Sequence, residues 1–221
     1  FQKKLVDLFF PAKCLECKEK GSFICPKCFK DIPLFDELPI EIQIDPPKYL
    51  DGLVVAAHYD YPLVRKAILK FKYDFVGKLS IPLAKLMIER VKIFPGLFRE
   101  AVLIPVPLYK KRLKWRGFNQ SELLAREIGR YFNLPVLTGV LKRNKKTKPQ
   151  AEIPDINGRQ ENIENAFSLA SEPNFQKLKG KNIILIDDLA TSGATLSACA
   201  KVLKPLRPRP KSIWALVVAH N

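Results

Sequence analysis

One stretch near the carboxyl end of the chain constrains the fold more than any other. Residues 182–186, of which the last four are apolar, predict a buried strand, and two acids, Asp187 and Asp188, follow directly. Small and hydroxyl residues come next, and Ala194–Leu203 has the pattern of a helix. A strand, an acidic end, a tight turn and a helix are typical of an open α/β sheet, which binds its ligand at the carboxyl ends of the strands.

The chain from residue 50 onward alternates predicted strands with predicted helices. Further strands are expected at 50–58, 101–106 and 213–219, and further helices at 63–71, 80–94 and 121–132. This alternation predicts a parallel, doubly wound α/β sheet over residues 50–221. Residues 33–49 are interpreted as a linker, because 31–47 holds four prolines. Residues 1–32 would form a separate small module that begins with an amphipathic lead.

The turn after the two acids has the composition of a phosphate-binding loop. Its residues are Leu189, Ala190, Thr191, Ser192, Gly193, Ala194 and Thr195. Backbone N–H groups at a helix N-terminus and three hydroxyls would bind phosphate, and Gly193 would allow close approach to the backbone. The acids would repel phosphate, so they need ribose hydroxyls or a Mg²⁺ ion as partners. The alternative is a capped helix after a buried strand, with two exposed acids.

Four cysteines near the start of the chain predict a metal site. Cys14, Cys17, Cys25 and Cys28 form the pattern C-x2-C-x7-C-x2-C. Four thiolates favour zinc, with an iron–sulfur cluster as the second choice. Two disulfides would require an oxidising compartment, whereas we see no secretory signal. With four protein ligands the zinc would be structural. Cys199 is interpreted as a buried helix residue.

The net charge restricts the partners of the chain. Lys and Arg number 38 against 22 acids, a formal charge of +16. Such an excess favours nucleic acid, an anionic membrane surface or phosphorylated ligands, although solubility alone is the alternative. The apolar runs are far shorter than the roughly 20 residues of a membrane helix. We therefore expect no membrane span and a cytoplasmic protein.

Several segments together resemble one protein family. Residues 184–195 resemble the signature with which type I phosphoribosyltransferases bind 5-phosphoribosyl 1-pyrophosphate (PRPP): two acids followed by T-x-G-x-T. The chain as a whole is similar to the ComF family, which is associated with bacterial natural competence. The segments that carry this resemblance are Ile104-Pro105-Val106-Pro107-Leu108 with Arg112, Arg116-Gly117-Phe118-Asn119-Gln120 with Leu124-Ala125, the polar residues Thr147, Gln150, Arg159 and Asn162 with Ala166-Phe167, and the four cysteines. A small departure is Ala190-Thr191-Ser192, where the family more often has Thr-Thr.

The resemblance implies a type I phosphoribosyltransferase-like sheet flanked by helices, and roles for its residues. Asp187 and Asp188 would hold the ribose hydroxyls of PRPP, directly or through Mg²⁺, and position the sugar for catalysis. Residues 191–195 would bind the 5′-phosphate. The turn with Val106 and Pro107 would lie by the pyrophosphate. Candidate charge partners of the pyrophosphate are Arg112 and Arg116. Residues 142–165, for which we predict no regular element, would lie near a mobile loop that closes over the site.

Basic residues concentrate in three clusters, at 110–116, 142–148 and 204–211. The first cluster interleaves cations with aromatic rings, which suits single-stranded nucleic acid bound without sequence readout. Its candidate contacts are Lys110, Lys111, Arg112, Lys114, Trp115 and Arg116. The alternatives are a solvated face, or cations that serve the phosphates of PRPP. The prolines of the third cluster predict a simple exposed turn.

The resemblance leads to two functional hypotheses. In the first, the protein binds PRPP as a ligand or regulator and handles incoming single-stranded DNA during natural transformation. Its partners would then be a DNA-uptake helicase or recombination proteins. In the second, it is an active phosphoribosyltransferase that transfers phosphoribose from PRPP to an acceptor. The residues that would read that acceptor are not identifiable in the sequence.

Overall fold

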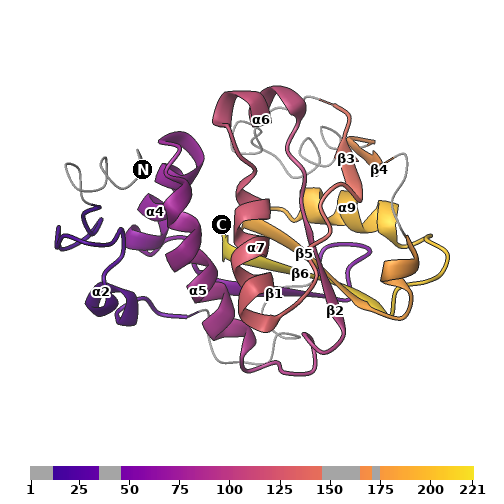
Figure 1. Cartoon of the computed structure of the whole chain (residues 1–221), viewed down its shortest axis with the longest axis horizontal. Helices are drawn as coiled ribbons and strands as arrows, with labels where there is room; N and C mark the ends of the chain where they lie inside the picture. Colours follow the sequence, from indigo (N-terminus) through magenta and orange to yellow (C-terminus); the bar gives the residue numbers. More distant parts are fainter. Residues whose placement is uncertain (1–11, 35–45, 146–164, 171–174) are drawn as a thin grey trace.

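A computed structural model of the chain describes residues 12–34, 46–145, 165–170 and 175–221 (Figure 1). At its centre lies a four-stranded parallel sheet in the order β1-β6-β5-β2. These strands are β1 (Gly52–His58), β2 (Ala101–Pro105), β5 (Asn182–Ala190) and β6 (Ser212–His220). A separate antiparallel pair consists of β3 (Leu141–Arg143) and β4 (Phe167–Leu169).

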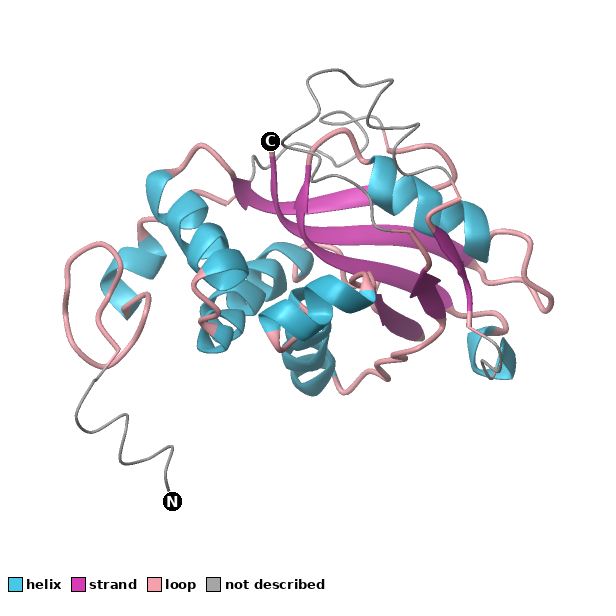
Figure 2. Ribbon diagram, turned by 90° about the horizontal axis from the view of Figure 1, so that it is seen from above, coloured by secondary structure: helices cyan, strands magenta, loops and turns pink. Residues whose placement is uncertain are grey.

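Helices cover both faces of the sheet, as Figure 2 shows in a view from above. One face carries α9 (Ala194–Leu203), while α5 (Ser80–Val91) and α7 (Gln120–Phe132) pack against the other face. The remaining helical elements are α2 (Pro26–Lys30), α4 (Pro62–Tyr73), α6 (Lys110–Arg116) and the 3-10 turns η1 (Gly77–Leu79) and η3 (Phe175–Leu178). The predicted α/β fold class is therefore confirmed.

Strand β5 shows why the sheet needs both helical layers. Ile183 and Leu185 point into the core beneath α9, whereas Ile184 and Ile186 point into the core beneath α5 and α7. All four side chains are completely buried. A parallel strand that is covered on both faces has a continuous apolar sequence, because neither face meets water. Polar residues at alternate positions would be buried in one of the two cores. A continuous apolar run is the pattern from which the strand was predicted.

The cysteine segment packs on the face that carries α4 and α5. Cys14, Ile24 and Cys28 belong to the same buried cluster as the side chains of these helices. Lys66 of α4 donates a hydrogen bond from Nζ to the carbonyl oxygen of Leu15 at 2.9 Å. The segment is thus attached to the sheet domain by apolar packing and by a direct hydrogen bond. The amphipathic lead and most of the predicted linker lie outside the described residues.

The structure corrects two of the predicted boundaries and contains a helix that was not predicted. The helix predicted over 80–94 ends at Val91. Residues 110–116, interpreted as flexible cations, form helix α6, which ends at Gly117 in the left-handed conformation. Strand β5 continues to Ala190, four residues beyond its predicted end, because Asp187 and Leu189 still pair with β6. The two acids therefore lie within the strand and not in the loop that follows it.

The described residues also bear on two further predictions, the exposed turn at 204–211 and the absence of a membrane-spanning helix. Residues 204–211 form an irregular turn in which most side chains are exposed, as their prolines suggested. No helix in these ranges combines the length and the apolar composition that a membrane crossing requires.

Candidate ligand site at the carboxyl edge of the sheet

The carboxyl ends of all four parallel strands meet at one cavity of about 230 Å³. Tyr59 follows β1, Val106 follows β2, and Asn221 follows β6. Strand β5 contributes the two acids directly. The cavity is lined by Tyr59, Ile68, Leu69, Lys72, Tyr73, Val106, Leu108, Arg112, Arg116, Gln120, Ser121, Arg143, Asp187, Asp188, Leu189, Thr191, Thr195 and Asn221. This is the edge at which open α/β sheets bind their ligands.

The two acids are held by different partners. Asp187 accepts hydrogen bonds at Oδ1 from the Ser121 hydroxyl, at 2.8 Å, and from the backbone N–H of Asp188, at 2.9 Å. Asp188 forms an ion pair with Lys72, whose Nζ lies 2.9 Å from Oδ1. The other carboxylate oxygen of Asp188 is buried and has no hydrogen-bond partner among the described residues. An orphaned buried acceptor is energetically unfavourable unless a ligand supplies a donor or a cation.

Burial and mutual repulsion shift the ionisation of this site. Burial, followed by the nearby charge of Asp188, raises the pKa of Asp187 to about 6. Burial acts to lower the pKa of Lys72, but the charges of Asp188 and Asp187 outweigh it and raise that pKa. Lys72 is therefore a fixed positive charge, while Asp187 titrates close to neutral pH. Such perturbed groups gathered in one cleft are typical of functional sites.

Helix α6 divides the first basic cluster between two surfaces. Arg112 and Arg116 are four residues apart and therefore share one side of the helix, the side that lines the cavity. Arg116 is only 9% exposed, and its Nε has no hydrogen-bond partner among the described residues. The other basic side chains and the indole ring are exposed: Lys110, Lys111, Lys114 and Trp115. The interpretation as cations for the phosphates of PRPP thus concerns the two arginines at the cavity. The interpretation as a nucleic-acid surface concerns the exposed residues of α6.

The exposed side of α6 carries an aromatic platform, formed by Trp115 with Phe75. Trp115 is 60% exposed and meets the ring of Phe75 edge to face, with 4.8 Å between the centroids. Phe75 is itself 42% exposed. Tyr73, which is 52% exposed, lines the cavity, and the guanidinium of Arg116 lies 6.0 Å from the centroid of its ring. Large exposed rings of this kind are uncommon on a surface without a partner. Phe75 and Tyr73 were not among the predicted contacts.

The predicted phosphate loop follows β5 and leads into α9, but its glycine has an unexpected neighbour. Gly193 has a φ of 69°, and a Cβ atom built on it would lie 2.3 Å from Cγ of Pro47. The close approach that Gly193 permits in this structure is therefore that of Pro47, at the end of the predicted linker. Ser197 reinforces this contact, because its hydroxyl donates to the carbonyl oxygen of Lys48 at 2.8 Å.

The predicted ligand residues are only partly gathered at the cavity. Those that line it are Asp187, Asp188, Leu189, Thr191, Thr195, Val106, Arg112 and Arg116. Those that do not are Pro107, Ala190, Ser192, Gly193 and Ala194. Ser192 is nevertheless near the loop interior, since its buried Oγ has no hydrogen-bond partner among the described residues. The predicted Thr147, Gln150, Arg159 and Asn162 lie outside the described residues.

Several lining residues escaped the sequence reasoning. Lys72 lies just beyond the helix predicted over 63–71, because α4 continues to Tyr73, and it was not singled out. Arg143 was counted only as part of a basic cluster. Ser121 and Gln120 looked like the start of a helix, yet they are 3% and 2% exposed and face the acids and the cavity. The sequence signal that could have identified Gln120 and Ser121 as site residues is the Arg-Gly-Phe-Asn-Gln block, which ends at Gln120.

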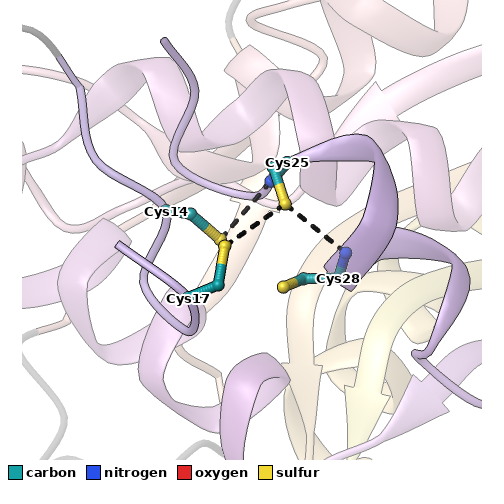
Figure 3. A group of neighbouring side chains, drawn as sticks. All are labelled: Cys14, Cys17, Cys25 and Cys28. Atoms are coloured by element: carbon teal, nitrogen blue, oxygen red, sulfur yellow. Dashed lines mark hydrogen bonds between the residues drawn. The ribbon is translucent and has the colours of Figure 1, made fainter. Parts of the chain in front are cut away.

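The four N-terminal cysteines converge on one point (Figure 3), with all four Sγ atoms within 4.8 Å of one another. All four are free thiols in this structure, not disulfides. The backbone N–H groups of Cys25 and Cys28 point at the Sγ atoms of Cys14 and Cys25, each at 3.5 Å. Such contacts stabilise thiolates, and the cluster could therefore hold a metal ion such as zinc.

Ionisation differs among the four cysteines: burial and the neighbouring thiols raise the pKa of Cys28 to about 12, whereas the pKa of Cys14 is lowered. Burial acts to raise the pKa of this thiol, but hydrogen bonds from the backbone at Cys25, Glu16 and Cys17 outweigh it and bring the pKa to about 6. A thiolate at neutral pH is the form that binds metal. Three of the four cysteines are buried, and only Cys17 is exposed.

The comparisons with known proteins first define the class. Residues 118–221 match the phosphoribosyl transferase domain family. With the parallel sheet and the cysteine cluster, this match defines a phosphoribosyltransferase-fold protein with an N-terminal four-cysteine module.

The relatives then define the family. The chain is 30% identical to Competence protein F of Haemophilus influenzae, over 96% of this chain and 99% of that protein. It is 26% identical to DNA utilization protein YhgH of Escherichia coli K12, over 92% of this chain and 87% of the relative. It is also 36% identical to Competence protein ComFC of Bacillus subtilis, over 60% of this chain and 45% of that protein. The chain belongs to the ComF family, the family of Competence protein F, as the resemblance predicted.

The cysteine cluster generates the first prediction. The Cys14→Ser/Cys17→Ser variant should lose bound zinc, and its N-terminal module should melt at a lower temperature, because the metal and the core packing of this segment are linked. Zinc content by mass spectrometry and thermal unfolding measure the two effects. Cys199→Ser is the control, since Cys199 is buried in the opposite core and should leave the zinc content unchanged. Undiminished zinc and an unchanged melting temperature in the double variant would refute a structural metal.

The raised pKa of Asp187 generates the second prediction. The folded state favours the protonated carboxyl, so Asp187 destabilises the protein increasingly as pH rises from about 4 to above 6. Asp187→Asn should therefore stabilise the protein by about 1–3 kcal/mol at about pH 7.5, and by much less at about pH 4. Denaturant unfolding at both pH values measures the difference. Asp74→Asn, at the exposed end of α4, should show no such pH-dependent gain, and an equal gain at both pH values would contradict the assignment to Asp187.

Proposed function

We propose that the protein binds PRPP with Mg²⁺ at the carboxyl edge of its sheet and handles single-stranded DNA in natural transformation. One observation carries the first part: carboxylates, a hydroxyl-lined helix start and two arginines line the same cavity. PRPP combines a vicinal diol with a phosphate and a pyrophosphate. The cavity offers a matching group for each of these parts.

The acids suit the diol of the ligand. Asp187 is positioned by Ser121, and Asp188 keeps one buried oxygen without a partner among the described residues. Ribose hydroxyls would donate to these carboxylates, as charge-assisted hydrogen bonds. The same hard oxygen atoms fit Mg²⁺, which in proteins is bound by one or two carboxylates together with phosphates of the substrate. When bound, Mg²⁺ would neutralise charge on the pyrophosphate.

The cations and hydroxyls suit the two phosphate ends. Thr191 and Thr195 line the cavity where α9 begins, so a monophosphate bound there would meet hydroxyl groups and the N-terminus of a helix. Arg112 and Arg116 provide planar guanidinium groups, which bind phosphate oxygens in pairs. Because Arg116 is almost fully buried, an anion in the cavity would offset the desolvation of its charge.

The exposed side of α6 supports the second part of the proposal. Trp115 and Phe75 form a ring pair, and three lysines of the same helix are exposed beside it. Bases of a single strand would stack on the rings, while its phosphates would contact the lysines. Two relatives are named for competence and one for DNA utilization, which connects the family with DNA. A DNA-uptake helicase or recombination proteins would then be the partners.

An active phosphoribosyltransferase is the second candidate function, and the two cavity arginines favour it. Transfer of phosphoribose breaks the bond between the ribose C1 and the pyrophosphate oxygen, and the leaving pyrophosphate gains negative charge. Guanidinium groups at Arg112 and Arg116 would stabilise that charge in the transition state. Release of pyrophosphate that depends on an added nucleobase is the observation that distinguishes this function from binding alone.

The PRPP site generates the third prediction. The protein should bind PRPP with Mg²⁺ in a calorimetric titration, and Asp187→Asn/Asp188→Asn should lose that binding, because the variant removes both negative charges and replaces one acceptor oxygen of each residue by an NH₂ donor. The matched control is Glu89→Gln/Glu122→Gln, which removes the same charge from surface ion pairs on α5 and α7. No binding by the intact protein, or equal binding by the acid variant, would exclude this site.

The aromatic platform generates the fourth prediction. Lys111→Ala/Lys114→Ala/Trp115→Ala should weaken binding of a single-stranded oligonucleotide by about tenfold or more, since one stacked base alone contributes about 1–3 kcal/mol. Loss of two phosphate contacts should also make the slope of log affinity against log salt shallower by about 1.4. Fluorescence anisotropy at several salt concentrations measures both quantities.

The control for this experiment removes the same residue types elsewhere. The control variant is Lys85→Ala/Lys92→Ala/Tyr131→Ala. It removes one lysine on α5, the lysine at the C-cap of α5 and an exposed tyrosine ring on α7. Its affinity and salt slope should stay close to those of the unaltered protein. Equal losses in both triple variants would mean that net charge, and not the α6 surface, determines DNA binding.

A further inference from the structure

Two lysines converge on one backbone carbonyl of the cysteine segment. Lys18, which directly follows Cys17, and Lys66, which lies on α4, each donate a hydrogen bond from Nζ to the carbonyl oxygen of Leu15. Both distances are 2.9 Å, so the two nitrogen atoms are separated by at most twice that distance. Two ammonium groups so close together repel each other, and one neutral carbonyl group does not cancel their charge.

Neither lysine is paired with a carboxylate in the part of the chain that the structure describes. This is notable because Glu16 and Glu19 belong to the same short segment as Lys18. Lys18 also has a φ of 67°, a left-handed conformation that is unfavourable for a residue with a Cβ atom. The segment therefore holds two neighbouring cations against their repulsion, and an anion close by would offset that cost.

The cysteine cluster is the anionic group that this place offers. Leu15 lies between Cys14 and Cys17 in the first C-x2-C pair, and the four Sγ atoms converge within 4.8 Å of one another (Figure 3). A zinc ion held by four thiolates keeps two negative charges, because four anionic ligands surround a dication. The two lysines carry two positive charges. The charge of the loaded cluster and the charge of the lysines therefore balance.

The sheet domain meets the cysteine segment with cations. Besides Lys66 on α4, Lys85 on α5 reaches the segment, and its Nζ lies 4.5 Å from the centroid of the Phe29 ring. Elsewhere on α4 a lysine has an acidic partner, since Lys70 forms an ion pair with Asp74. The side of the two helices that faces the cysteines thus differs in charge pattern from their outer side.

We propose that Lys18 and Lys66 are positioning residues of the metal centre, whose charges compensate the zinc–thiolate group and increase its affinity for zinc. The inference rests on a metal at the cysteine cluster and is independent of what the cavity binds. Groups that surround the ligands of a metal commonly change its affinity by about 10–100-fold. Because both lysine side chains are exposed, the effect should lie at the lower end of this range, and salt should weaken it.

Competition between the reduced full chain and a zinc-binding dye, at about 0.05 M and about 0.5 M NaCl, tests the inference. Lys66→Gln keeps an N–H donor without the charge, and it should bind zinc about tenfold more weakly at low salt and nearly normally at high salt. Lys18→Gln should show a loss of the same kind. Lys66→Arg keeps the charge and should bind zinc as the unaltered protein does. Lys70→Gln, on the same helix, is the matched control and should bind zinc normally.

The absorption spectrum of Co²⁺ bound in place of zinc is the second readout, because it reports the ligands of the metal. The spectrum should be the same in Lys66→Gln as in the unaltered protein, since all four thiolates remain. A changed spectrum, or a loss of affinity that is equal at both salt concentrations, would overturn the charge role in favour of a purely structural contact.

The remaining outcomes are also decisive. Normal zinc affinity in both Lys66→Gln and Lys18→Gln would overturn the inference and leave the metal site intact. An unaltered protein that binds no zinc would overturn it together with the metal site. If Lys66→Gln does not fold, Lys18→Gln decides, because this side chain lies outside α4 and the sheet domain.

Discussion

The structure depends on one constraint: a parallel sheet must be covered on both faces. Strand β5 meets it with consecutive apolar residues that face alternate cores, such as Ile183 toward α9 and Ile184 toward α5 and α7. Since every strand runs in the same direction, all four carboxyl ends arrive at one edge. The ligand cavity is a geometric consequence of this topology, and the polar residues that the faces exclude can gather only at this edge or on the outer surfaces.

The site carries charges that oppose folding. Asp187 and Asp188 are adjacent, and Asp188 is nearly buried, so their repulsion and desolvation are only partly offset by Lys72 and Ser121. This unfavourable electrostatic energy raises the pKa of Asp187 to about 6, through burial and the charge of Asp188. A protein keeps such an arrangement where function requires it, and the stability is supplied by the two apolar cores.

The sequence predicts the sheet, the acids and the cysteine cluster because each is a local pattern. Buried strands are apolar runs, and paired C-x2-C segments bring thiolates together over a short distance. Lys72, Arg143 and Pro47 could not be predicted in this way, since each reaches the site from a separate part of the chain. Helix α6 was missed for another reason: its seven residues are mostly cationic, without the apolar stripe that marks a packed helix. The family resemblance placed its two arginines at the site, and the tertiary structure shows that both line the cavity from one side of this helix.

Helix α4 connects the two functional parts of the molecule. Lys66 is bonded to the carbonyl oxygen of Leu15, within the cysteine segment, and Lys72 is bonded to Asp188. The two lysines lie on one twelve-residue helix, whose apolar side is completely or almost completely buried. Packing on the apolar side of α4 fixes the positions of both lysines. The position of the Lys72 ammonium over the acidic pair therefore depends on how firmly α4 is seated, and the cysteine segment provides one of the surfaces on which it is seated. The four-cysteine module, far from the cavity in the sequence, is thus joined through a single helix to a residue that lines the candidate ligand site.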